Sequence, residues 1–265
     1  MLLVQGRRHR LPCGNQNWSG TMDSELQNIL ILAHPGHELR IHHWLERAKP
    51  RVYLLTDGSG GRHNARTEYS HHIVKAAGAT PGSVFGEIPD AAWYEALLAG
   101  DQIFFLDVFT RISADLDSDQ EVQVVSDAVD GYNPVHDLAF VFGSAVNALL
   151  QKKRKGHQQL CSAAVPNVPG TVQVEIKLDQ DAQARKRAAI EAYTPLADEA
   201  RLILARDPGC LTRERLITQT PDWTAQTPEW ERIGRERVAK GIYGRCITYK
   251  DNVQPIVRLL LARSD

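Results

Sequence analysis

Residues 29–38 read Ile-Leu-Ile-Leu-Ala-His-Pro-Gly-His-Glu, an apolar run that gives way within one residue to a polar turn. Four consecutive apolar residues, two of them β-branched, are typical of a short strand that is buried on both faces. Pro35 lacks a backbone N–H donor and Gly36 permits a sharp turn, so we expect the strand to end there. In open α/β sheets, ligands bind beyond the carboxyl ends of the strands. The stretch therefore predicts two imidazoles and a carboxylate at such an edge.

The segments that follow this strand alternate between helical and strand patterns. Residues 39–48 and 66–77 have helical spacing, and residues 52–55 form an apolar run typical of a strand. This order favours a parallel sheet, because parallel strands need a crossover connection. Further along, the pattern predicts a buried segment at 103–106 of unassigned type, a strand at 122–125, an apolar helix at 138–150, a strand at 172–176 and three later helical segments.

The length of 265 residues suits one large α/β domain. We expect this domain to cover residues 22–265, with a helical C-terminal part over about 179–265. Residues 1–21 lack the apolar core of a signal peptide and are rich in polar and small residues towards their end. We interpret them as a disordered tail or a start-site artefact, with Met22 as an alternative start.

Composition excludes several classes of partner. The formal net charge of −1 gives no indication of a nucleic acid partner. No apolar run approaches the length of a membrane span. The four cysteines are scattered without a C-x-x-C pair, which favours reduced thiols in the cytoplasm. A homo-oligomer is compatible with the sequence but not specified by it.

Three histidines in strand-end turns suggest a metal site. His34 and His37 are three residues apart in one turn, and His136 follows a second turn rich in Gly, Asn and Pro. Three neutral imidazoles leave a fourth tetrahedral position for water, as in catalytic zinc sites. Two alternatives stay open: the histidines are solvated or capping residues, or the Gly-rich loop at 56–61 binds a nucleotide although it lacks the Walker and G-x-G-x-x-G patterns.

Four motifs in this order resemble the PIG-L/LmbE-type zinc-dependent N-acetylglucosaminyl deacetylases. Residues 33–38 (A-H-P-G-H-E) resemble the family's A-H-P-D-D-E, and residues 133–136 (N-P-V-H) resemble its H-P-D-H. Residues 55–58 (L-T-D-G) match its L-T-x-G turn, and Arg66 stands where the family has an arginine that contacts substrate. The resemblance covers residues 28–150 best. It implies a Rossmann-like α/β fold with zinc (Zn²⁺) at the carboxyl ends of the strands and an N-acylated amino sugar or similar small molecule as substrate.

The departures from the family pattern concern catalysis more than metal binding. By position, His34 and His136 match metal-ligating histidines, and His37 stands at the ligating aspartate, which imidazole can replace at zinc. Gly36 stands where the family has its general-base aspartate. Asn133 replaces the histidine that assists the developing oxyanion, and its amide can still donate a hydrogen bond.

Another carboxylate would have to accept the proton when water attacks a carbonyl. Glu38 and Asp57 lie at the ends of the first two strands, and Asp130 and Asp137 flank His136. Three of them have a structural interpretation as well: Glu38 and Asp137 as helix caps and Asp57 as a turn residue. Asp137 could equally accept the second N–H of a ligating histidine. The sequence does not choose among them.

We therefore expect a zinc-dependent hydrolase that removes an N-acyl group, in the simplest case N-acetyl, from an amino sugar or a related small molecule. The expected site contains the ligands His34, His37 and His136, the substrate-binding Arg66, and the catalytic candidates Glu38, Asp57, Asn133 and Asp137. The alternative is a family member that binds metal and a sugar-like ligand without turnover.

Overall fold

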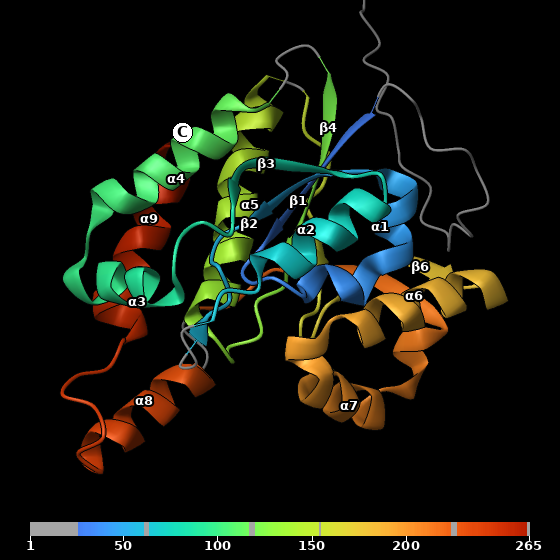
Figure 1. Ribbon diagram of the computed structural model, residues 1–265. Helices are drawn as coiled ribbons and strands as arrows, with labels where there is room; N and C mark the ends of the chain where they lie inside the picture. Colours follow the sequence, from blue (N-terminus) through green and yellow to red (C-terminus); the bar gives the residue numbers. More distant parts are fainter. Residues whose placement is uncertain (1–25, 61–63, 117–119, 154, 224–226, 264–265) are drawn as a thin grey trace, which may run out of the picture.

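The computed structural model describes residues 26–60, 64–116, 120–153, 155–223 and 227–263 (Figure 1). The tail predicted at 1–21 lies outside these residues. The described chain is an α/β structure in which helices cover both faces of one sheet. The predicted fold class is thus confirmed, and the arrangement is compatible with a Rossmann-like fold.

The sheet has seven strands in the described residues, in the order β3-β2-β1-β4-β5-β7-β6. Strands β1 to β5 pair in parallel, whereas β7 runs antiparallel to both β5 and β6. The mainly parallel sheet expected from the sequence is present. The strands are β1 (Leu26–Leu32), β2 (Arg51–Leu54), β3 (Thr80–Phe85), β4 (Glu121–Asp127), β5 (Leu160–Ser162), β6 (Thr171–Lys177) and β7 (Arg213–Thr218).

Helices connect most of these strands. Short 3₁₀ helices precede α1, α7 and β7. The α-helices of the described residues are α1 (His42–Ala48), α2 (Thr67–Ala76), α3 (Asp90–Ala99), α4 (Gln102–Ala114), α5 (Pro134–Lys152), α6 (Gln180–Ala192), α7 (Ala197–Arg206), α8 (Glu229–Ala239) and α9 (Gln254–Arg263). The 3₁₀ helices are η1 (His37–Ile41), η3 (Thr194–Leu196) and η4 (Pro208–Leu211), and a π turn, η5 (Tyr249–Val253), precedes α9.

Strand β1 divides the core into two halves. Ile29 and Ile31 belong to the cluster packed against α3, α4, α5 and α9, whereas Leu30 and Leu32 belong to the cluster packed against α1, α2 and α6. All four side chains are fully buried. Successive residues of a strand point to opposite faces, so a strand covered on both sides needs an unbroken apolar run. This is why residues 29–32 are apolar without alternation.

Three strands and one exposed side chain depart from the sequence predictions. Strands β3, β5 and β7 were not predicted: β3 contains Pro81 and Gly82, β5 has three residues, and β7 places the charged Glu214 on its buried side. Residues 103–106 lie in α4, and Ile103 is 80% exposed rather than buried. The helical period turns that side chain to solvent while Phe105 enters the core.

A buried ion pair fastens the C-terminal elements to the region after β1. Lys186 of α6 is 0% exposed and donates to Glu214 Oε1 of β7 and to the backbone carbonyl of Arg40, each at 2.8 Å. Glu214 also accepts the backbone N–H groups of His43 and Trp44 at the start of α1. A buried charge is tolerated when it is paired and hydrogen-bonded, and this pair meets both conditions.

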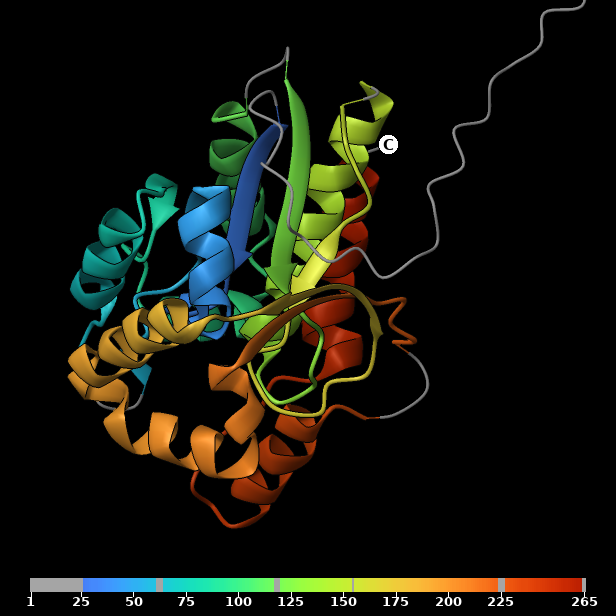
Figure 2. The same cartoon turned by 90° about the vertical axis from the view of Figure 1, so that its right-hand side faces the viewer.

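The strand order reverses at β1 and β4, which are neighbours although two other strands separate them in sequence. In open α/β sheets, the crevice beyond the carboxyl ends at such a switch point is the usual ligand site. Helices α6 and α7 lie beyond these strand ends in both ribbon views (Figure 2). Among the described residues, no helix has the length and apolar character needed to cross a membrane.

Candidate functional site

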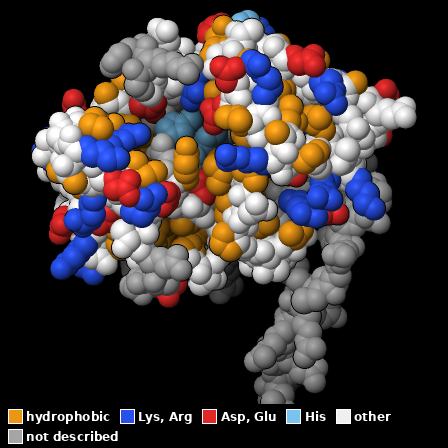
Figure 3. Space-filling view, turned by 90° about the horizontal axis from the view of Figure 1, so that it is seen from below, with side chains coloured by type: hydrophobic (Ala, Val, Ile, Leu, Met, Phe, Trp, Pro, Cys, Tyr) orange, Lys and Arg blue, Asp and Glu red, His pale blue; other side chains and the backbone are white. Residues whose placement is uncertain are grey.

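Three histidine rings converge at the switch point. His34 and His37 follow β1, and His136 lies in the first turn of α5, after β4. Their ring centroids are 5.4 Å (His34–His37), 5.0 Å (His34–His136) and 4.7 Å (His37–His136) apart, with the rings meeting edge to face. His34 and His136 are buried, at 6% and 5% exposure. Seen from below, histidine side chains lie at the floor of a hollow (Figure 3).

Each of these imidazoles has a carboxylate beside its Nδ1 atom. His37 Nδ1 donates to Asp127 Oδ2 at 2.8 Å, and His136 Nδ1 donates to Asp130 Oδ2 at 2.7 Å. His34 Nδ1 lies 2.7 Å from Thr56 Oγ1 and 3.2 Å from Asp90 Oδ1. A carboxylate acceptor requires the hydrogen to be on Nδ1, so the Nε2 atoms are left with a free lone pair in the neutral rings.

This pairing is the one that metal-ligating histidines use to fix their tautomer and orientation. Three imidazoles that bind one tetrahedral zinc ion through Nε2 have ring centroids about 5 Å apart, given zinc–nitrogen distances of about 2.1 Å. The observed centroid distances of 4.7 to 5.4 Å fall at that spacing. In the described residues, however, no group of three or more His, Cys, Asp or Glu side chains is arranged so that it could hold a metal ion.

The electrostatics of the cluster keep at least one ring neutral. Burial, together with the neighbouring His136 and His37, lowers the pKa of His34 to about 4 against the opposing influence of Asp90. Although burial disfavours its charged form, the bond to Asp130 and the nearby carboxylates raise the pKa of His136. For Asp127, the charge and hydrogen bond of His37 outweigh burial and lower the pKa. Neutral His34 is thus available as a ligand or an acceptor at neutral pH.

The turn after β1 is held by contacts from elsewhere in the chain. Gly36 adopts a φ of +106°, and its N–H donates to Glu38 Oε2 at 2.8 Å. Glu38 is fully buried and accepts a second bond from Ser70 Oγ of α2. Burial raises the pKa of Glu38, with the Ser70 bond acting against it. Glu38 therefore braces the turn, and its carboxylate oxygens are both engaged there.

Leu196 occupies the space that a side chain at position 36 would need. A Cβ on Gly36 would lie 2.1 Å from Leu196 Cδ1, a side chain of η3 in the C-terminal part of the chain. Tyr193, just before Leu196, hydrogen-bonds Ser70 Oγ and the Arg66 carbonyl and so holds this segment in place. The position that carries the general base in the resembled family is thus filled from a different element by an apolar group.

The turn after β4 is closed largely by its own residues. Asp137 Oδ1 accepts the backbone N–H groups of Asp130 and Gly131, and its Oδ2 accepts from Trp230 Nε1 at 2.8 Å. Burial raises the pKa of Asp137 to about 6, with the charge of Asp130 adding to the effect and the Trp230 bond opposing it. Asn133 is the N-cap of α5: its Oδ1 accepts from Val135 N, and its Nδ2 donates to Tyr94 Oη. Both candidates serve the geometry of the loop.

Asp57 and Arg66 lie on the far side of the cluster, after β2. Asp57 Oδ1 accepts the backbone N–H groups of Ser59 and Asp90, which makes it a turn residue as placed. The Arg66 side chain packs on Gly58, where an added Cβ would lie 2.7 Å from Arg66 Nε. Arg66 Nε is buried and has no hydrogen-bond partner among the described residues. It is thus a donor left for a ligand.

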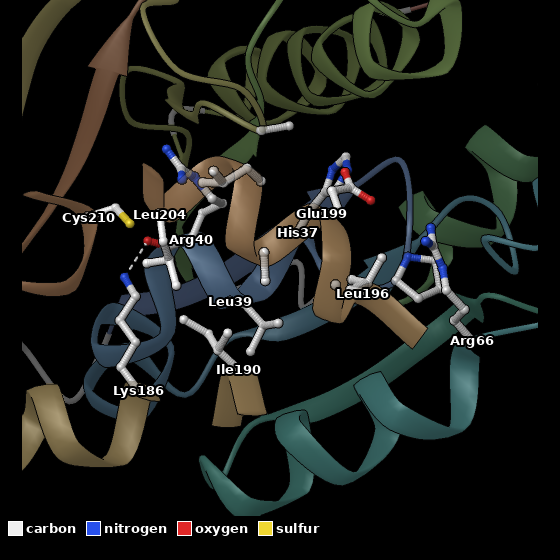
Figure 4. A pocket seen from close by; sticks show the side chains of 15 residues that line it. His37, Leu39, Arg40, Arg66, Lys186, Ile190, Leu196, Glu199, Leu204 and Cys210 are labelled. Carbon is white, nitrogen blue, oxygen red and sulfur yellow. Dashed lines mark hydrogen bonds between the residues drawn. The ribbon is translucent and has the colours of Figure 1, made fainter. Parts of the chain in front are cut away.

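A cavity adjoins the cluster between the β1 turn and α7 (Figure 4). Its empty volume is about 640 Å³, part of which is open to solvent. Pro35, Gly36 and His37 lie at its wall together with Arg66. The remaining lining residues are Leu39, Arg40, Ala164, Lys186, Ile190, Leu196, Glu199, Ala200, Ile203, Leu204 and Cys210.

The carboxylate partners Asp90 and Asp127 are the main site residues that sequence reasoning missed. Asp127 ends β4 directly and also accepts the Ala33 N–H at 2.7 Å, so its strand-end position was a usable signal. Asp90 opens α3, and only the fold brings it to His34. Comparisons of the chain with protein-family models, with curated proteins and with solved structures each find no match. The function is therefore inferred from the geometry of the site.

Proposed function

We propose that the protein is a zinc-dependent hydrolase that cleaves the N-acyl amide of an amino sugar or a related small molecule. In this proposal His34, His37 and His136 hold one divalent ion. The order of four motifs that resemble those of PIG-L/LmbE-type deacetylases supports the assignment, as does the location at a switch point of the sheet.

One observation carries the proposal. Three imidazoles meet at one point, and each has its Nδ1 beside a different carboxylate, from Asp90, Asp127 and Asp130. Histidines that serve only packing have no need of three separate acidic partners, and burying three carboxylates costs free energy unless something compensates them. A divalent cation among the Nε2 atoms supplies the missing positive charge. Zinc suits an imidazole-rich ligand set with an open fourth position.

When bound, such an ion polarises a carbonyl oxygen and lowers the pKa of water. The residues of the chain orient the ligands and hold the substrate. Arg66, with its unpartnered Nε, would donate to a hydroxyl or carbonyl oxygen of the substrate. Asp127 holds His37 through Oδ2, and its Oδ1 is buried without a hydrogen-bond partner in the described part of the chain. Asp90 Oδ1 also lacks a hydrogen-bond partner in the described residues but lies 3.2 Å from His34 Nδ1, so Asp127 is our candidate for accepting a proton.

A second function, binding of metal and ligand without turnover, is favoured by the contact between Gly36 and Leu196. No carboxylate can stand at position 36 while Leu196 lies 2.1 Å from where its Cβ would be. Glu38, the nearest acid in the turn, has both oxygens engaged. If Asp127 cannot serve as base, the site would bind without catalysing.

Nucleotide binding by the loop after β2 receives less support. Its backbone N–H groups are already used within the protein: Gly58 N donates to Thr56 Oγ1, Ser59 N to Asp57 Oδ1 and Gly60 N to Asp90 Oδ2. A phosphate cradle needs such N–H groups free.

The test is an amide-hydrolysis assay on zinc-loaded protein with N-acyl glucosamines of increasing acyl length, measuring the primary amine released. We expect amine release by the wild type. We expect none by His34→Ala, because this variant lacks one of the three imidazoles proposed to hold the ion. Stoichiometric zinc without amine release from any substrate would favour the binding function. Absence of zinc binding would overturn both.

A further inference from the structure

The cavity beside His37 is lined by apolar side chains along most of its length. Leu39 and Ile190 form one wall; Leu39 belongs to the core cluster on that face of the sheet, and Ile190 is partly buried against it. In Figure 4 these two residues and Leu196 lie between Arg66 at one end and Lys186 and Cys210 at the other. The apolar section therefore begins at the histidine cluster and leads away from it.

Helix α7 supplies the opposite wall with an amphipathic face. The lining residues Leu196, Ala200, Ile203 and Leu204 recur at helical spacing and form one stripe. An apolar stripe of this kind normally packs against a core, yet α7 has no buried residue, and its Ala200, Ile203 and Leu204 line the cavity instead. Leu202, outside the stripe, is 60% exposed. An apolar ligand in the cavity would give the stripe the packing that it lacks.

Of the charged groups along this cavity, Lys186 and Arg40 have partners within the protein, and the Glu199 carboxylate disfavours an anionic ligand. Lys186 is paired with Glu214, and Arg40 donates from Nε to the Ala163 carbonyl and lies 3.5 Å from Asp207. Arg40 Nη1 is buried without a partner in the described residues and marks a polar far end. An anionic or sugar group in the middle section would lose its hydration without gaining hydrogen bonds there, whereas a hydrocarbon chain loses nothing.

We infer that this cavity receives the acyl chain of the substrate, and that the preferred acyl group is a linear alkanoyl chain rather than acetyl. The inference rests on the proposed hydrolase function for its assignment of the chain to an N-acyl substrate. The amide would lie at the histidines, the amine portion near Arg66, and the chain under α7. Each methylene buried is expected to raise binding about fourfold.

The first measurement is binding of octanoate to protein stripped of metal with a chelator, followed by calorimetry. It does not depend on catalysis. We expect saturable binding by the wild type, at least about tenfold weaker binding by Ala200→Trp, which fills the cavity, and unchanged binding by the matched control Leu202→Trp. No binding by the wild type, or equal loss in both variants, overturns the inference.

The second measurement compares kcat/KM for N-octanoyl- and N-acetyl-glucosamine on zinc-loaded protein. We expect a preference for the octanoyl substrate of at least about 100-fold, reduced in Ala200→Trp and kept in Leu202→Trp. Equal or better cleavage of the acetyl substrate overturns the inference and leaves the hydrolase standing. Octanoate binding that Ala200→Trp blocks, with no cleavage of either amide, supports the chain-binding cavity and overturns the hydrolase.

Discussion

The two turns that present the histidines are stabilised in different ways. The turn after β1 (residues 33–38) depends on distant groups: Asp90 and Asp127 for its imidazoles, Ser70 for Glu38, and Leu196 over Gly36. The turn after β4 (residues 128–137) is held by bonds within itself, including the pair His136–Asp130, and also by Tyr94, Gln219 and Trp230 from other elements. The histidine of the second turn thus finds its carboxylate within the turn, whereas the histidines of the first turn depend on carboxylates from other elements.

This difference distinguishes residues that would bind the metal from residues that hold the metal-binding side chains in place. Loss of the Asp130 carboxylate, which pairs with His136 inside the β4 turn, should act on metal binding with little effect on the β1 turn. A change inside the β1 turn should also disturb α2, α3 and the C-terminal part, because their side chains end on it. The predictions below test this division, starting with the largest effect.

Replacing His136 by alanine removes the ligand that the β4 turn contributes. We expect His136→Ala to lose most of its zinc, because two imidazoles bind the ion far more weakly than three. Metal content of the purified protein, measured by mass spectrometry, is the readout. His72→Ala is the matched control, since that side chain is 73% exposed and lies outside the cluster. Equal zinc in wild type and His136→Ala would show that the assignment is wrong.

Replacing Gly36 by aspartate tests the long-range support of the β1 turn. We expect Gly36→Asp to lower the free energy of unfolding by about 1–3 kcal/mol, because of its φ of +106° and the contact with Leu196. Gly100→Asp is the control: its φ is +65°, and an added Cβ meets nothing within 4 Å. Urea unfolding gives both values.

The double variant Gly36→Asp with Leu196→Ala should recover part of the lost stability relative to Gly36→Asp. If the double variant is no more stable than Gly36→Asp, Leu196 exerts no constraint on position 36. The double variant also carries a carboxylate where the resembled family has its base. A gain in hydrolysis of about 10²–10⁴ over Leu196→Ala alone would show that the natural chain lacks an efficient base.

The carboxylates Asp127 and Asp130 allow a direct comparison of the two turns. Asp127→Ala and Asp130→Ala should each weaken zinc binding about 10–100-fold, because each loses the acceptor that orients a histidine. Asp127→Ala should also lower the melting temperature more, because it leaves the buried Ala33 N–H without its acceptor. Competition with a zinc chelator and thermal unfolding measure the two effects. Equal melting temperatures would remove the distinction between the turns.

The smallest effect is expected for Arg66. Arg66→Ala should weaken ligand binding about tenfold through loss of a charged donor, while zinc content and melting temperature stay near those of the wild type. Lys75→Ala, an exposed substitution on the same helix, is the control. Unchanged KM and ligand affinity in Arg66→Ala would show that Arg66 does not contact the ligand.

The parts of the fold that the sequence predicted are those with strong local patterns. The unbroken apolar run of β1 is recognisable because a strand buried on both faces needs apolar residues throughout. The helical period of α5 is recognisable because its apolar residues recur on the buried side of the helix. Strand β7 was missed because its inward-facing Glu214 interrupts the apolar alternation, and the buried Lys186 that compensates it comes from another element. No local rule predicts a charge that is acceptable only because of a distant partner.

The site divides along the same line. The histidines could be singled out because they stand at strand ends beside Pro and Gly. Their carboxylate partners were harder to find, since Asp90 reaches His34 from α3 only after the sheet has formed. Leu196 could not be inferred at all, because an apolar residue in a C-terminal 3₁₀ turn carries no sign that it will face Gly36.

The buried ammonium group of Lys186 has a consequence for chemical labelling. An amine acylates only as the free base and only when reagent can reach it, and Lys186 is both fully enclosed and paired with Glu214. Its labelling by an amine-reactive reagent therefore measures how often α6 separates from β7. Because Lys186 also lines the cavity under α7, the rate of that one modification, followed by peptide mapping, measures how often this part of the molecule opens. A ligand that fills the cavity should lower this labelling rate.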